Sequence, residues 1–204
     1  MRLTWQGSYE REEQLPKAEL PTNAVCLREP DNLEEVNRQA VRFLPAAMVP
    51  VLLADALRCF CWGFPGWSGF FHWGGLVVSI FLLLPHELLH AAAYPRGAEC
   101  GLWISLHGGA LFVTGTSPMS RQRFLWVSLL PACLLSLLPL TAWVIFPAMN
   151  GIWFTASALH LVSCTGDFCN CWNMIRQVPK DATIQQSGFH TYWYFSPGSA
   201  EKEE

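Results

Sequence analysis

Four stretches of this chain are apolar enough, and long enough, to cross a membrane as helices. They lie at residues 43–64, 70–94, 124–146 and 151–175. Each has at least the roughly 20 residues that a spanning helix needs. The pattern predicts an all-α membrane protein, built as a bundle of about four transmembrane helices.

The first stretch is the weakest of the four, because it contains prolines and two charged side chains. Asp55 and Arg58 are three residues apart, so a helix would bring them onto one face. Ionisable side chains inside a membrane are costly unless they are paired. We therefore expect these two residues to form an ion pair.

A different pattern separates the second stretch from the third. In residues 101–115, Leu102, Ile104 and Leu106 recur at every second position, and two glycines follow at Gly108 and Gly109. This pattern predicts a short β-hairpin with a two-residue turn. The edge of such a hairpin can accept an extended peptide as an added strand. A ribbon that only covers the bundle is the other interpretation.

Basic residues predict how the chain is oriented in the membrane. They precede the first stretch, lie between the second and third, and follow the fourth, whereas residues 65–69 and 147–150 carry none. Loops rich in lysine and arginine stay in the cytoplasm. We expect a multi-pass protein of the cell membrane with both termini cytoplasmic. Its parts are a cytoplasmic arm at 1–40, a transmembrane domain at 41–176 and a cytoplasmic tail at 177–204.

Composition supports a lipid environment. Hydrophobic residues make up 51% of the chain and charged residues 14%, whereas soluble proteins have about 25% charged residues. The formal net charge is only −3 and no basic patch is present. This argues against a nucleic-acid partner.

The second stretch ends in the motif His86-Glu87-Leu88-Leu89-His90. On a helix, two histidines four residues apart face the same side and can bind one zinc ion, with the intervening glutamate beside the water that zinc activates. Chance would give roughly 0.01 such matches in a chain of this composition. We therefore predict a metal site with His86 and His90 as ligands and Glu87 as the general base.

A zinc site of this kind needs a third protein ligand and an open position for water. Asp167 lies as far along the fourth stretch as His86 lies along the second, since each is 16 residues from the start of its stretch. Both stretches are expected to run in the same direction, so Asp167 is the favoured ligand. His160 is the alternative, although it lies about 10 Å deeper at 1.5 Å per residue.

These features together resemble a known family. The motif at 86–90, the hairpin, the segment 119–131 and the late Gly166-Asp167 pair are similar to those of small bacterial membrane proteins called putative zincin peptidases. Those proteins in turn resemble the site-2-protease group of intramembrane metalloproteases. The resemblance covers residues 41–184. It implies that His86, His90 and Asp167 hold zinc and that residues 41–176 form a metalloprotease-like domain acting on a peptide or membrane-protein substrate.

Two other functions fit the same residues. The chain could bind metal without hydrolytic activity, as a scaffold or pseudoprotease. It could also be a small transporter that uses His86, Glu87 and Asp167 to relay protons or metal ions. Glu87→Gln separates these possibilities, because it removes the general base of a peptidase without removing a predicted metal ligand.

Overall fold

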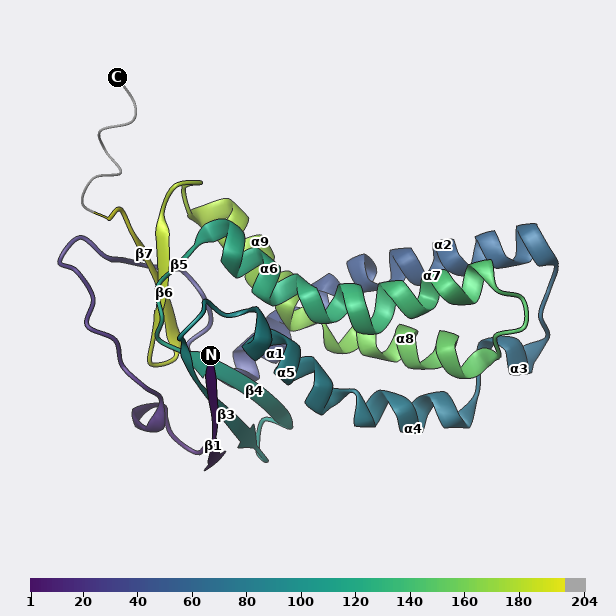
Figure 1. Cartoon of the computed structure of the whole chain (residues 1–204), viewed down its shortest axis with the longest axis horizontal. Coiled ribbons are helices and arrows are strands. Elements are labelled where there is room, and N and C mark those ends of the chain that lie inside the picture. The colour runs from purple at the N-terminus through teal and green to yellow at the C-terminus, as the bar shows by residue number, and fades with distance from the viewer. Residues whose placement is uncertain (197–204) are drawn as a thin grey trace, which may run out of the picture.

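The computed structural model describes residues 1–196 and shows an elongated helical bundle with two small β-sheets at one end (Figure 1). The bundle contains helices α2, α4, α7 and α8 along its length, while α5, α6 and α9 lie next to the sheets. The α-helices are α1 (Leu33–Ala40), α2 (Leu44–Trp62), α3 (Trp67–Phe70), α4 (Trp73–Phe81), α5 (Leu83–Ala93), α6 (Arg121–Pro131), α7 (Leu138–Ile145), α8 (Gly151–Ser163) and α9 (Thr165–Gln177). Three other helical segments are η1 (Glu12–Gln14) and η2 (Val41–Phe43), which are 3₁₀-helices, and the π-helix η3 (Ala132–Leu137).

Within residues 1–196, two continuous helical segments are long and apolar enough to cross a membrane, Leu33–Trp62 and Arg121–Ile145. A third candidate is a broken span, in which Trp67–Phe81 and Leu83–Ala93 meet at 44°. The fourth predicted span is interrupted at Cys164, and its apolar part is the shorter helix Gly151–Ser163. The structure thus supports two spans directly, rather than the predicted four.

The outer surface of the bundle is apolar. Phe60 on α2 is 88% exposed, and Phe81 on α4 is 75% exposed. Large exposed apolar surfaces of this kind indicate a membrane or another partner. Two helices are also long and apolar enough to cross a membrane, by length and composition, and this favours the first of these two interpretations.

Pro85 explains the bend between α4 and α5. It lacks the N–H that would bond to the carbonyl of Phe81, and its ring crowds that carbonyl. The regular helix resumes at once, because the His86 amide donates to the Leu82 carbonyl at 2.9 Å. The motif histidines therefore lie on a helix whose direction differs from that of α4.

Helix α4 packs against α8 more closely than a side chain would allow. A Cβ atom at Gly75 would lie 2.6 Å from the Thr155 Cβ atom and 2.7 Å from the Ile152 carbonyl oxygen. Small residues permit this kind of approach between membrane helices. This contact holds α4, which leads into the motif helix α5, beside α8, which leads into the Asp167 helix α9.

Arg58 does not pair with Asp55. Its side chain is 4% exposed, and its guanidinium donates to the backbone carbonyls of Trp143, Phe146, Pro147 and Met149. These carbonyls lie at and beyond the end of α7, where no further helical turn can satisfy them. The predicted ion pair was wrong, because unsatisfied carbonyls on another helix offered acceptors that no local pattern reveals.

The expectation of an all-α protein also needs correction, because the described residues form two sheets. One has the order β1-β3-β4, with β1 (Arg2–Ser8), β3 (Glu99–Ser105) and β4 (Ala110–Gly115). The other has the order β2-β7-β6-β5, with β2 (Val25–Cys26), β5 (Met119–Ser120), β6 (Thr183–Ser187) and β7 (His190–Tyr194). Most neighbouring strands come from distant parts of the chain, and β1 runs parallel to β3. Pairing of this kind leaves no signal in a local pattern.

The predicted hairpin at 101–115 is confirmed as the antiparallel pair of β3 and β4. Its turn is longer than expected, because Ser105 pairs with Ala110 and residues 106–109 lie between them. The Ser105 hydroxyl accepts a hydrogen bond from the Gly108 amide at 3.1 Å, and Gly109 has a φ of +59°. The strands are thus joined by a four-residue loop rather than a two-residue turn.

The two terminal regions meet at the same end of the bundle (Figure 1). Residues 1–40 contribute β1 and β2, and residues 177–196 contribute β6 and β7. Residues 197–204, the rest of the predicted tail, lie outside the described part of the chain. The sheets form a cap over the end of the bundle that contains α5, α6 and α9.

Candidate metal centre

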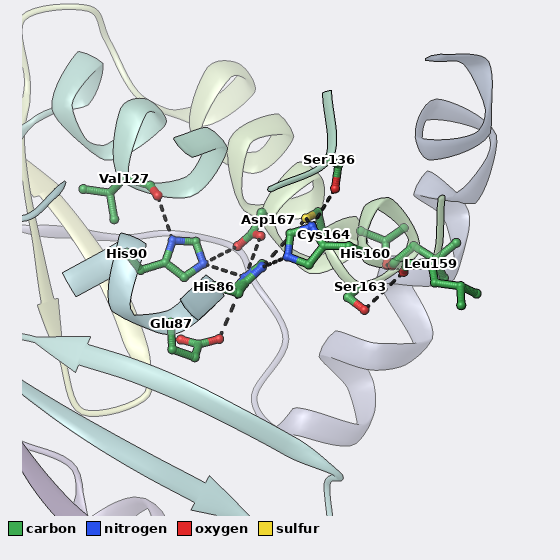
Figure 2. A network of polar contacts seen from close by, with 12 residues as sticks. His86, Glu87, His90, Val127, Ser136, Leu159, His160, Ser163, Cys164 and Asp167 are labelled. Carbon is green, nitrogen blue, oxygen red and sulfur yellow. Dashed lines mark hydrogen bonds and ion pairs between the residues drawn. The ribbon is translucent and has the colours of Figure 1, made fainter. Parts of the chain in front are cut away.

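His86 and His90 project from the same face of α5 (Figure 2). Their Nε2 atoms lie 2.9 Å apart, and their ring planes are inclined at 83°. This follows from the helix, which turns once in 3.6 residues and so aligns positions four apart. Both side chains are nearly buried, with exposed fractions of 9% and 12%.

Asp167 meets both histidines from α9. Its Oδ1 atom lies 3.2 Å from His90 Nε2, and its Oδ2 atom lies 3.3 Å from His86 Nε2. The interruption at Cys164 places Asp167 in the first turn of α9, next to the motif helix. One atom from each of the three residues falls within 4.8 Å of the others. The structure thus brings together the three residues that the sequence predicted as ligands.

This donor set fits zinc. Two imidazole nitrogens and a carboxylate oxygen are common zinc ligands, and Zn–N distances of about 2.0–2.1 Å in a tetrahedron separate neighbouring ligands by about 3.3 Å. The observed separations of 2.9, 3.2 and 3.3 Å are close to this value. In addition, the buried Oδ2 atom of Asp167 accepts no hydrogen bond within the described residues. A buried carboxylate oxygen without a donor is costly, and a cation would satisfy it.

The backbone fixes the orientation of His90. Its Nδ1 atom lies 2.7 Å from the carbonyl oxygen of Val127 on α6. Only a protonated Nδ1 can donate to a carbonyl, which leaves the lone pair of a neutral ring on Nε2. His90 therefore directs its metal-binding nitrogen toward His86 and Asp167.

Glu87 lies beside the three candidate ligands. Its Oε1 atom is 3.8 Å from His86 Nε2, and its side chain is 10% exposed. Strand β4 packs against α5, and Val113 of β4 lines the same cavity as Glu87. The Glu87 carboxylate therefore lies next to the candidate metal centre but is not one of its three ligands.

His160, the alternative third ligand, lies on the opposite side of the His86 ring. Its Nε2 atom is 3.1 Å from His86 Nδ1, and its Nδ1 atom is 2.6 Å from the Ser136 hydroxyl. It also forms, with His86 and Cys164, a second group whose atoms lie within 4.8 Å of one another. Sequence reasoning missed Ser136 and Val127. Cys164 follows His160 by four residues and so shares its face of the helix.

A cavity of about 230 Å³ gives access to the centre. It is lined by His86, Glu87, His90 and Asp167 on one side and by residues of α1 and β4 on the other. A neighbouring cavity extends it toward Glu29 and Thr191. The two cavities share the lining residues Leu33, Val36, Phe112, Val113, Phe124, Asn170 and Gln186. They form one groove, with strand β4 along its side.

Comparison with known proteins identifies one family. Residues 79–183, just over half of the chain, match the family model described as "Putative zincin peptidase". The match includes the motif at 86–90, strands β3 and β4, and Asp167. No curated protein and no solved structure matches the chain.

Proposed function

Because the chain belongs to the putative zincin peptidase family, we propose that it is a membrane-embedded zinc metallopeptidase that hydrolyses peptide bonds. One observation carries the proposal. The Nε2 atoms of His86 and His90 converge with the Asp167 carboxylate, while Glu87 lies 3.8 Å from His86. Three ligands and an adjacent base are the arrangement that zinc-assisted peptide hydrolysis uses.

The chemistry divides between the metal and Glu87. Zinc held by His86, His90 and Asp167 would supply Lewis acidity, which lowers the pKa of a water molecule and polarises a peptide carbonyl. Glu87 accepts the proton from the attacking water and delivers it to the leaving amine, as a general base and then a general acid. Its low exposure keeps bulk water away from this transfer.

We propose that the substrate binds as an extended peptide along β4. This strand is an edge of its sheet and lies beside the motif helix α5. The Ile104 carbonyl accepts a hydrogen bond from the Tyr9 amide and so faces away from β4. Leu111, its partner across the β3–β4 pair, is therefore a non-hydrogen-bonded position whose N–H faces the open edge. A peptide paired with this edge would lie in the groove, with a backbone carbonyl next to the centre.

The site would lie near the cytoplasmic boundary of the membrane, as in the site-2-protease group. The apolar bundle extends to one side of the centre, and the sheets lie on the other (Figure 1). Both terminal regions pair with strands that lie within the connection between α5 and α6, β1 with β3 and β6 with β5. This arrangement supports the orientation expected from the basic residues, with that loop and both termini in the cytoplasm.

Metal analysis of the detergent-purified protein tests the proposal. We expect one zinc per chain in the wild type, and its loss in both His86→Ala and Asp167→Ala. His107→Ala is the matched control, because His107 is an exposed histidine of the hairpin turn. Zinc that survives Asp167→Ala would place the third ligand elsewhere.

Glu87→Gln then separates peptidase activity from the two alternatives. A peptidase keeps its zinc and loses cleavage of membrane or peptide substrates. A scaffold or pseudoprotease shows no cleavage in either form. A relay loses transport of protons or metal ions, with no peptide products in the wild type.

A further inference from the structure

The His86 ring is held from behind by two buried side chains. His160 lies against its Nδ1 atom, and Ser136 lies against the far nitrogen of His160. His160 is 1% exposed and Ser136 is 0% exposed. Three polar side chains thus form a line that leads from the centre into the bundle (Figure 2).

Such a line can be protonated in two ways, and only one is compatible with a metal. In one direction, the Ser136 hydroxyl donates to His160, whose Nε2–H then donates to His86 Nδ1. A neutral His86 would then carry its proton on Nε2 and could not bind a metal through that atom. In the other direction, His86 Nδ1–H donates to His160 Nε2, and His160 Nδ1–H donates to Ser136 Oγ. This second direction leaves the Nε2 lone pair facing Asp167 and His90.

We propose that His160 and Ser136 are positioning residues that hold His86 in its metal-binding tautomer and orientation. The inference rests on the proposed zinc centre and deepens it. His160 does for His86 what the Val127 carbonyl does for His90, since each accepts the proton of an Nδ1 atom. Groups in this position typically change metal affinity by about 10–100-fold when they are removed.

The backbone around Ser136 supports the assignment. Ser136 lies in η3, a π-helical segment between α6 and α7. π-helical turns are rare and occur often at functional sites. Segment η3 contacts α8, the helix that carries His160. The widened turn brings the Ser136 hydroxyl to 2.6 Å from His160 Nδ1.

The competing interpretation is a second metal site made by His86, His160 and Cys164. A neutral imidazole has one lone pair, so His86 cannot bind metal through both nitrogens without losing a second proton. Cys164 Sγ also lies 3.7 Å from His160 Nδ1, the nitrogen already engaged by Ser136. The hydrogen-bonded line therefore accounts better for these contacts.

Zinc affinity, measured by chelator competition on the full-length protein in detergent, tests the proposal. His160→Leu should weaken zinc binding by about 10–100-fold. His160→Gln should restore binding to within about threefold, because its side-chain oxygen can accept the proton of His86. Ser136→Ala should weaken binding less than His160→Leu does, since it acts through His160. Ser157→Ala is the matched control. The Ser157 hydroxyl is buried on α8, the helix that carries His160, and it has no hydrogen-bond partner among the described residues.

The outcomes distinguish this proposal from the proposed function. A wild type without zinc overturns the metal centre itself. A wild type with one zinc, and equal affinity in His160→Leu, overturns only the positioning role. Two zinc ions in the wild type, one of them lost in Cys164→Ser, establish a second site instead. If His160→Leu does not purify, unchanged affinity in Ser136→Ala overturns the proposal, and weakened affinity beside an unaffected Ser157→Ala supports it.

Discussion

The Nε2 atoms of His86 and His90 face each other at 2.9 Å, while the Nδ1 atom of each ring is engaged on its far side. If both rings are neutral, two lone pairs point at one another, which is unfavourable without a cation between them. We therefore expect zinc to stabilise the fold. At a free zinc concentration 100 times its Kd, the gain in the free energy of unfolding is about 2.7 kcal/mol.

Thermal unfolding in detergent, with and without a strong chelator, measures this stabilisation. The chelator should lower the midpoint of the wild type and leave that of Asp167→Ala unchanged. Equal midpoints in the wild type, after confirmed removal of zinc, contradict the prediction.

The second prediction concerns Arg58. Arg58→Met should lower the free energy of unfolding by about 3 kcal/mol, because buried carbonyls beyond α7 lose a charged donor. Asp55→Asn is the control. It should cost less than about 0.5 kcal/mol, as is usual where no special contact is lost. Equal destabilisation by the two variants, measured by chemical unfolding, would mean that Asp55 and Arg58 act as a pair after all.

Glu29 should make stability depend on pH. Burial raises the pKa of this carboxyl from 4.5 to about 7, although a hydrogen bond from the Thr191 amide opposes the shift. The folded chain then holds a proton that the unfolded chain releases, so this contribution is greatest below pH 4.5 and is lost as the pH rises toward 7. The Nδ1 atom of His190 lies 3.8 Å from Glu29 Oε1. The Nε2 atom of the same ring lies 4.0 Å from Asp31 Oδ1.

Glu29→Gln isolates the contribution of this carboxyl. The unfolding midpoint of the wild type should fall relative to that of Glu29→Gln between pH 5 and pH 7.5, since the amide does not titrate. Parallel midpoints across this range would show that Glu29 has the same pKa in the folded and unfolded chains.

Leu111→Pro tests the role of the β4 edge. Proline removes a backbone N–H that faces away from β3, so the hairpin should persist while pairing with a substrate strand weakens. We expect zinc content to stay at the wild-type level and cleavage to fall at least about tenfold. Leu111→Ala keeps the N–H and should retain most of the activity. Equal cleavage by the two variants would remove β4 from substrate binding.

The local features of the fold could be predicted from the sequence, whereas its long-range pairings could not. The apolar stretches and the hairpin each depend on residues close together in the chain, and the structure contains helices and a hairpin at those places. Strand β1 is different, because it pairs in parallel with β3 almost 100 residues later. Residues 2–8 alone do not reveal that partner.

The candidate site divides in the same way. The spacing of His86 and His90 follows from one helical turn, and the meeting with Asp167 follows from equal depth in two neighbouring helices. Ser136 could not be found, because its place beside His160 depends on a π-helical turn and on the packing of η3 against α8. The expected span boundaries also hid the break at Cys164 and the break at Leu82, where two helices meet at 44°.

The second sheet has a consequence for the order in which the protein becomes competent during synthesis. Gln186 of β6 lines the groove and accepts a hydrogen bond from Tyr94 at 2.7 Å. Because β6 and β7 follow the histidine motif by more than 90 residues, a nascent chain carries that motif before the groove can close. Until β6 is synthesised, the wall of the groove beside the candidate metal centre lacks Gln186.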